Sequence, residues 1–452
     1  MSEIIPRAEI RLNKGVFFHS GNPPLILNLN GERACKISLV STEDIRLLSL
    51  LYLGLQGQKY TSLNYKEECK LSDWLDKRIL IKFSLNNREK GRARDPFMSL
   101  FREFQSAGLV TRQRHSLAEY HRKGIADPAG QFEEEEITLS HVYRLPHPAL
   151  GGMSYGERFA QVCCDRGILK PGSNILEVGC GTGLFGNAFL SYLRKEHPEI
   201  YSSIHYTFFD LSPTLLSSQK EINRAHQKIT AFVEDNIEDF DFGFSRFDLV
   251  VSNEMIADLE VARLEKAYFF SDKRPPDSLR DVVGFCKRLA LNFEDAFEEF
   301  LINIGAFRFL AKLKEILAPG GKAIIVEYGD LSLYPIASEL KSHTEFSIHF
   351  GHLIDVARRL GFRVESSNML DSMEFRKDEE VLDFLSFIAL KEHLLPFFGN
   401  TISHVAYTRE GLFRAIGEEF LSRIQGLGFA KIKDATATVN PQQFLVLTIS
   451  LE

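Results

Sequence analysis

The chain has 452 residues, 44% of them hydrophobic, which is enough for two or three domains with a sizeable core. Its net charge of −7 excludes the basic surface that a general nucleic-acid binder needs, so no nucleic-acid partner is expected. Its six scattered cysteines form no Cys-x-x-Cys pair, so no metal site is expected. No signal-like or membrane-spanning run occurs, and we expect a soluble cytoplasmic protein that does not contact a membrane.

Residues 1–125 are predicted to form a separate α+β module. Strand-like segments between residues 7 and 38 precede two expected helices, at Thr42–Leu55 and Lys66–Leu80. This order resembles a small winged-helix-like module, which implies recognition of a substrate or partner. Residues 126–140 have the polar, acidic composition of a linker.

Residues 141–452 alternate strands and helices, which predicts an α/β domain built on a doubly wound, Rossmann-like sheet of seven strands. Two insertions, at about 260–315 and 372–427, are expected to be helical, the first of them as a cap over the binding crevice. The sixth strand is ambiguous, because Phe362 and Phe429 each follow a helix-ending glycine. The other expected elements are helices at Tyr155–Leu169, Leu184–Lys195, Pro213–His226 and Phe350–Leu360, and strands at Ile204–Phe209, Ile229–Val233, Phe247–Ser252, Lys322–Tyr328 and Gln443–Leu451.

Gly179, Gly181 and Gly183 follow the first strand of this domain and precede a helix. Such glycines let the backbone turn sharply and approach a ligand, and the helix start offers unpaired N–H groups. Gly186 completes a loose Gly-x-Gly-x-x-Gly match, so a dinucleotide is one candidate ligand. Glu177 would repel a pyrophosphate but suits the ammonium group of S-adenosylmethionine (SAM), so the loop favours SAM.

Polar residues also follow the next strands directly, where one crevice can collect them. Asp210 is placed to accept both ribose hydroxyls, and Asp235, with Asn236 behind it, to read the adenine amino group. Asn253 and Glu254 open beneath the expected sulfonium. Each of these residues alone could be a helix N-cap, but their occurrence in order favours a site. The expected SAM-binding residues, with S-adenosylhomocysteine as product, are Glu177, Gly179, Cys180, Gly181, Gly183, Asp210, Leu211, Asp235, Asn236 and Asn253.

Four segments, Ile175–Gly183, Ser252–Asp258, Val326–Gly329 and Glu345–Phe350, resemble motifs of the class I SAM-dependent methyltransferases, and more narrowly of the MidA family. That family includes the mitochondrial complex I assembly methyltransferase, which modifies a protein arginine. The resemblance covers about half the chain and implies the same fold, cofactor and reaction type.

The chain departs from the MidA pattern in ways that bear on the acceptor. Asp258 arrives one residue later than the family's aspartate, Glu327 stands for an aspartate, and Gly351 replaces an acid. The N-terminal module is additional.

Guanidinium is a poor nucleophile because its charge is delocalised. Glu254, with Asp258 or Glu260 nearby in sequence, could localise that charge on one nitrogen. His349 could orient a carboxylate or accept the released proton, or could simply be a helix-start residue without a role. The expected catalytic residues are therefore Glu254, His349 and Asp258.

The leading hypothesis is methyl transfer from SAM to a nitrogen of a protein, peptide or arginine-like acceptor, with arginine favoured. Two alternatives remain open. One is O- or N-methylation of a small natural product, and the other is a SAM-binding scaffold or assembly factor without turnover. A homodimer is also considered.

Overall fold

The fold was analysed in a computed structural model. The structure describes residues 10–12, 16–19, 25–28, 80–83, 120–122, 125, 128–134, 137–339, 344–384, 386–387, 390–391, 402–417, 427–434, 437 and 441–451.

The first 125 residues contribute two antiparallel strand pairs to the described part of the chain. β1 (Ile10–Leu12) pairs with β4 (Leu80–Phe83), and β2 (Val16–His19) pairs with β3 (Leu25–Asn28). The expected helices at 42–55 and 66–80 lie outside the described residues, apart from Leu80, which begins β4. The winged-helix-like arrangement therefore stays a prediction.

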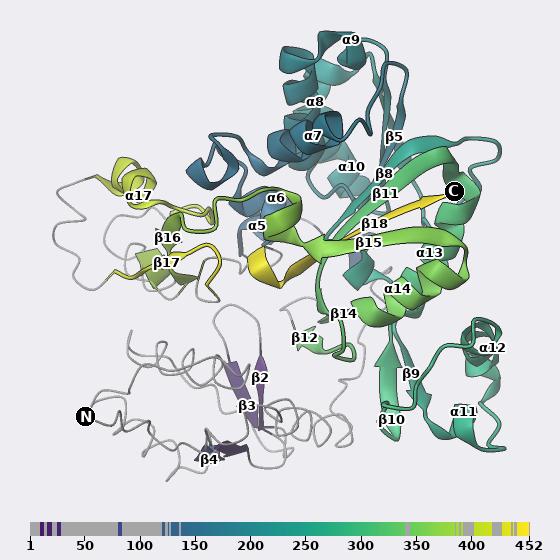
Figure 1. The fold of residues 1–452 in the computed structure, drawn as a ribbon. Helices are drawn as coiled ribbons and strands as arrows, with labels where there is room; N and C mark the ends of the chain where they lie inside the picture. Colours follow the sequence, from purple (N-terminus) through teal and green to yellow (C-terminus); the bar gives the residue numbers. More distant parts are fainter. Residues whose placement is uncertain are drawn as a thin grey trace.

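The rest of the molecule is organised around one large sheet (Figure 1), whose main path has the strand order β15-β18-β11-β8-β5-β6-β7. A short additional strand, β14, pairs with the end of β11. The strands are β5 (Asn174–Val178), β6 (His205–Asp210), β7 (Thr230–Glu234), β8 (Phe247–Asn253), β11 (Leu317–Asp330), β14 (Ile348–His349), β15 (Phe362–Asn368) and β18 (Phe444–Leu451).

The pairing confirms a mixed α/β sheet with mostly parallel strands. β5, β6, β7, β8 and β11 run parallel to one another, whereas β18 is antiparallel to both β11 and β15. The ambiguity over the sixth strand is also resolved. The segment that begins at Phe362 pairs along the last strand, while β17 (Phe429–Lys431) pairs with β16 (Glu380–Leu382) in a separate ribbon.

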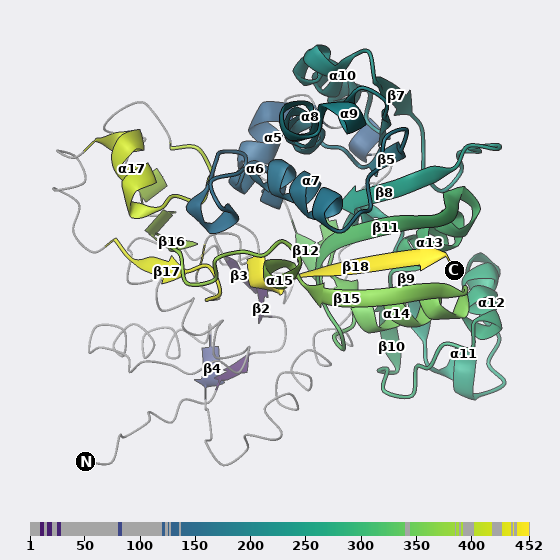
Figure 2. The same ribbon diagram turned by 45° about the horizontal axis from the view of Figure 1, so that its top comes forward.

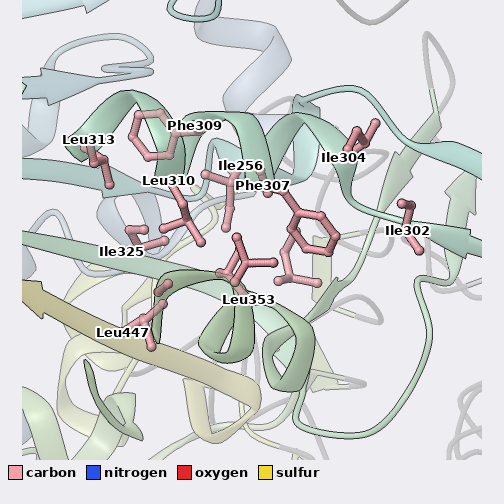
Figure 3. Close-up of a cluster of buried hydrophobic side chains, with 14 of the residues drawn as sticks. Ile256, Ile302, Ile304, Phe307, Phe309, Leu310, Leu313, Ile325, Leu353 and Leu447 are labelled. Atoms are coloured by element: carbon pink, nitrogen blue, oxygen red, sulfur yellow. The ribbon is translucent and has the colours of Figure 1, made fainter. Parts of the chain in front are cut away.

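Helices cover both faces of the sheet (Figure 2). On one face, α7 and α8 pack over a cluster that includes Ile175, Phe208 and Val251. On the other face, α13 and α14 pack over Ile325 and Leu447, as Figure 3 shows. The helices of the domain are α5 (Pro128–Glu134), α6 (Leu139–Val142), α7 (Tyr155–Asp165), α8 (Leu184–Glu196), α9 (Pro198–Tyr201), α10 (Pro213–Ile222), α11 (Ala267–Phe270), α12 (Arg280–Arg288), α13 (Ile304–Ile316), α14 (Phe350–Arg359), α15 (Met369–Ser372) and α17 (Arg409–Ile416).

The expectation that residues 260–315 are wholly helical is wrong. β9 (Ala262–Glu265) and β10 (Glu299–Ile302) form an antiparallel pair that frames α11 and α12. In β9 the buried residues Ala262 and Leu264 alternate with the more exposed Arg263 and Glu265, which is the period of a strand. Four residues are too few for that period to stand out from helical spacing in the sequence.

For the first insertion, the role of a cap over the crevice stays a prediction. The insertion packs beside the start of α14, at the lower edge of the molecule in Figure 1. The Tyr334 hydroxyl donates to Asp295 at 2.8 Å, and the Phe293 ring meets the His352 ring at 5.2 Å. The second insertion contains α17 but also β16, which pairs with β17 just after the insertion, so this segment is not wholly helical either.

Shorter elements complete the described chain. The 3-10 turns are η2 (Pro148–Leu150), η3 (Arg224–His226), η4 (Ile256–Asp258), η5 (Asp277–Leu279) and η6 (Pro441–Gln443), and β12 (Ala337–Glu339) pairs with β13 (Thr344–Phe346). Within the described ranges, every helix is too short or too polar to cross a membrane.

Gly186 allows α8 to pack closely on the sheet, and this contact gives a test of the fold. A Cβ at this position would come within 2.4 Å of the Phe208 ring and 2.6 Å of the Glu177 carboxyl. We expect Gly186→Ala to lower the free energy of unfolding by about 1–3 kcal/mol, because overpacking outweighs the gain in helix propensity.

Gly284 of α12 provides the matched control. The nearest atom to a Cβ there is the Arg288 guanidinium at 3.5 Å, an ordinary contact. Gly284→Ala should therefore raise the free energy of unfolding by about 0.5–1 kcal/mol. Denaturant titrations of both variants check this, and a Gly186→Ala protein as stable as the parent would contradict the packing described here.

Candidate active site

The glycine loop turns between β5 and α8 with a backbone that other residues rarely adopt. Gly179, Gly181 and Gly183 have φ angles of 70°, 52° and 88°. The Gly179 N–H donates to the Phe209 carbonyl at 2.9 Å, and a Cβ on Gly179 would lie 2.2 Å from the Met255 side chain. Glycine is therefore required at position 179 both by its conformation and by the close approach of Met255.

Two amide side chains of α10 hold this loop from the other side. Gln219 Nε2 donates to the Gly181 carbonyl at 2.9 Å, and Asn223 Nδ2 donates to the Gly183 carbonyl at 3.1 Å. Both amides are fully buried. We had not expected either residue in the site, although their spacing of four on a predicted helix places them on one face.

Asp210 ends β6 beside the loop, as expected from the sequence. Its Oδ1 accepts the Ser212 N–H and its Oδ2 accepts Gln219 Nε2, both at 2.9 Å. Burial raises the pKa of Asp210 to about 6, even though these donors favour its charged form. Each carboxylate oxygen has a second lone pair, so ribose hydroxyls can still be accepted. Leu211, partly buried, continues the chain away from this point.

Glu177 does not face the mouth of the crevice. It is 2% exposed, its Oε2 accepts the Tyr206 hydroxyl at 2.7 Å, and it lies under α8 at Gly186. Burial raises its pKa to about 8. Cys180 is also buried, with its thiol directed to the Glu177 carbonyl at 3.1 Å. In this structure Glu177 has a supporting role: its carbonyl contacts Cys180 of the glycine loop and its carboxyl packs against Gly186 of α8.

Asp235 follows β7 and is exposed beside Asp210, whose carbonyl accepts the Asp235 N–H at 3.1 Å. The Asn236 side chain is engaged in its own turn. It donates to Asp239 at 2.8 Å and accepts the Glu238 N–H at 3.2 Å. Asp235 thus remains placed to meet an adenine, whereas Asn236 shapes the turn behind it.

Asn253 and Glu254 lie where β8 ends, next to the glycine loop. Glu254 has a φ of 55°, an unusual conformation for a non-glycine residue, and its N–H donates to the Val326 carbonyl at 2.8 Å. Asn253 Oδ1 accepts the Tyr155 hydroxyl at 2.7 Å, and its Nδ2 donates to Glu254 Oε1 at 3.0 Å. Backbone and side chain together fix the direction of the Glu254 carboxyl. Burial raises the pKa of this carboxyl to about 8.

Further acidic residues surround Glu254. Glu327 at the end of β11 is buried, and its pKa is raised well above its usual value by burial and by the charge of Glu254. Asp258 in η4 lies 3.5 Å from the His121 ring nitrogen. The charge of Glu345 contributes to the raised pKa of Glu254. Glu260 instead points outward and pairs with Arg308.

His349 does not join this group. It begins α14, where its Nδ1 accepts the His352 N–H at 3.1 Å, and its ring stacks on that of His352 at 3.7 Å between centroids. Its own N–H donates to Asn303, and Tyr334 meets its ring edge-on. Burial lowers its pKa to about 4, so the ring is neutral at pH 7. Its partners are Asn303 at the end of the first insertion, Tyr334 in the loop after β11 and His352 of α14.

The segment expected as a linker contacts the crevice directly. The Leu139 N–H donates to Glu254 Oε1 at 2.8 Å, across 115 residues of sequence. The Phe132 ring of α5 covers the glycine loop, 3.3 Å from where a Cβ on Gly181 would lie. Phe132 belongs to a small buried cluster with Tyr120, Ile125 and Leu215. Nothing in the local sequence pattern of 126–140 indicates these distant contacts.

These residues fit the chemical parts of SAM. The positive-φ glycine turn leads directly into the start of α8, and Asp210 offers a carboxylate for ribose hydroxyls. The exposed Asp235 lies next to it for the adenine, and the Asn253–Glu254 turn adjoins the glycine loop through Met255. A dinucleotide pyrophosphate would meet the buried carboxyl of Asp210 beside the loop.

Comparisons with known proteins agree with this assignment. Residues 176–268 match a family model described as a methyltransferase domain. A polyketide synthase-nonribosomal peptide synthetase, ACE1 from Pyricularia oryzae, is 29% identical over 134 residues, which cover 28% of this chain. The chain spans only 3% of the length of that protein.

Solved structures with a similar arrangement are distant. A TehB-like SAM-dependent methyltransferase from Corynebacterium glutamicum is 17% identical with a TM-score of 0.30, covering 68% of this chain and 92% of its own. An uncharacterized ACR superfamily protein from Burkholderia thailandensis is 15% identical with a TM-score of 0.40, covering 81% and 94%. At such scores these structures lend no function to this one. The family model therefore identifies a methyltransferase domain in residues 176–268, and the residues of the crevice fit SAM as its cofactor.

Proposed function

We propose that this enzyme methylates a cationic nitrogen, with an arginine guanidinium of a protein or peptide as the favoured acceptor. The observation that supports the proposal is the group of carboxyls around the end of β8. Glu254 and Glu327 are both withdrawn from water, and the charge of Glu254 contributes to the raised pKa of Glu327. A cation bound between them would favour the ionised form of both. The likeness of four segments to MidA-family motifs points to the same acceptor.

The carboxyls also suit the chemistry of a guanidinium. SAM, when bound, supplies an electrophilic methyl group on a sulfonium. Glu254, held by Leu139 and Asn253, can draw the positive charge of the acceptor toward one nitrogen and leave the other more nucleophilic. The bound cation would favour the ionised form of Glu327, so that this carboxylate can accept the proton released from the methylated nitrogen.

Tyr155 and Asn253 act on Glu254 as positioning residues in this proposal. The Tyr155 hydroxyl fixes the Asn253 amide, which in turn donates to Glu254. His349, expected from the sequence as a base, is assigned no part in the reaction, since its side chain caps α14 and its ring packs against Tyr334 and His352.

The acceptor can be identified by incubating the enzyme with methyl-labelled SAM and host extract, then separating proteins from small molecules. We expect label in the protein or peptide fraction, recovered after acid hydrolysis as methylarginine. Label found only in neutral small molecules would contradict a cationic protein acceptor and support methylation of a natural product. Undiminished cellular function in a variant that no longer transfers label would support the scaffold alternative.

We expect Glu254→Gln to lower kcat by about 100-fold or more while SAM affinity changes only a few-fold, because Gln keeps the acceptor for Leu139 N–H but loses the charge. Single-turnover assays and calorimetry measure the two quantities. Glu260→Gln is the matched control, since Glu260 lies nearby in sequence but pairs outward with Arg308. Equal activities for the two variants would remove Glu254 from the mechanism.

The pH dependence should distinguish a cationic from a neutral acceptor. In the free enzyme the pKa of Glu254 is about 8, so the active, ionised form increases as pH rises and kcat/KM should climb until about pH 8. A bound guanidinium lowers that pKa, so the acid limb of kcat should lie about one pH unit or more below that of kcat/KM. Coincident limbs would indicate a neutral acceptor.

A further inference from the structure

The side chain of Gln219 connects two parts of the SAM crevice that come from different strands. Its Nε2 donates to the Gly181 carbonyl in the loop after β5 and to Asp210 Oδ2 at the end of β6, each at 2.9 Å. The residue is 0% exposed and lies one helical turn before Asn223 on α10. One amide group therefore touches both the loop that meets the methionine end of the cofactor and the carboxylate that meets its ribose.

Packing alone does not account for an amide at this place. Gln219 Oε1 is buried without a hydrogen-bond partner among the described residues. An apolar side chain of the same length would fill the space and leave no unpaired acceptor. What the amide adds is its two donor bonds, both of which end on groups of the crevice.

We propose that Gln219 is a positioning residue for SAM, which holds the glycine loop and Asp210 in one geometry so that the two ends of the cofactor are bound as a unit. The proposal rests on the SAM crevice and not on the class of acceptor. It can therefore fail while the proposed reaction stands, and the reverse is also true.

Asn223 provides an internal comparison, because it bonds to the glycine loop but not to Asp210. Its Nδ2 donates to the Gly183 carbonyl at 3.1 Å and to the Gln219 carbonyl at 3.0 Å. It is as deeply buried as Gln219, and its Oδ1 also has no partner among the described residues. It clamps the loop but has no bond to Asp210, so the two amides can be told apart by what happens at Asp210.

The two amides are distinguished by the pH dependence of cofactor affinity. The quantity to compare is the pH at which affinity falls on the acid side, called here the acid limb. Ribose hydroxyls are best accepted by ionised Asp210, whose pKa burial raises to about 6 and the Gln219 donor holds down. The other titratable groups that act on Asp210 are His121, Glu177 and Cys180. The Asp210→Asn variant identifies the contribution of Asp210, because asparagine does not titrate. The pH dependence due to Asp210 is lost in this variant, and that due to the other groups remains.

The test is calorimetric titration of S-adenosylhomocysteine into the full-length protein between pH 5.5 and 8.5. We expect Gln219→Met to weaken binding about tenfold at pH 7.5 and to move the acid limb up by about one pH unit. Asn223→Leu should weaken binding through the loop while its acid limb stays at the wild-type position. An acid limb in Gln219→Met that coincides with the limb in Asn223→Leu would overturn the proposal.

Gln219→Glu keeps the volume of the side chain and serves if Gln219→Met does not fold. Its carboxyl, when ionised, cannot donate to Gly181 or Asp210 and adds a like charge beside Asp210, so the acid limb should move to still higher pH. An acid limb at the same pH as in the wild-type protein would also contradict the proposed role of Gln219. Turnover is not needed for either measurement, so the result does not depend on knowing the acceptor.

Discussion

The structure depends on the close approach of the glycine loop to its neighbours. Met255 presses on Gly179 from the end of β8, and α10 presses on Gly183, where a Cβ would lie within 3.0 Å of the Gln219 backbone. These contacts bring the ends of β5, β6 and β8 to one place, although Val178 and Asn253 are 75 residues apart along the chain. A side chain at either glycine would separate the groups that form the crevice.

Burial of charge is the second constraint, and it gives the site its chemical character. Glu177, Asp210, Glu254 and Glu327 are all buried or partly buried, and burial raises the pKa of each. The free enzyme therefore holds protons that a cation could replace. A cation bound beside Glu254 and Glu327 would favour their ionised forms, and this is the physical basis of the cationic acceptor proposed above.

The sequence predicted those parts of the site that local patterns determine. Glycines at alternate positions and polar residues directly after apolar strands placed Gly179, Asp210 and Asn253 together, because parallel strands end at one edge of a sheet. The side-chain direction of Glu177 could not be predicted, since it depends on Tyr206 of the neighbouring strand. Likewise, the motif resemblance pointed to His349 but did not indicate which neighbours its ring would contact.

Contacts between segments that are distant in the sequence also could not be predicted. The bond from Leu139 to Glu254 and the position of Phe132 over the glycine loop join a polar, linker-like stretch to the crevice. The β9–β10 pair was missed because a period of two needs more than four residues to be distinguished from helical spacing. Such features depend on tertiary packing, which overrides local propensity.

A crystal structure of the protein with S-adenosylhomocysteine would test this description of the crevice most directly. It should show the ribose hydroxyls on Asp210, the adenine beside Asp235 and the sulfur atom facing Glu254, with Phe132 near the ligand or displaced by it. A ligand whose sulfur atom faces away from Glu254, or whose ribose lies elsewhere than on Asp210, would contradict it.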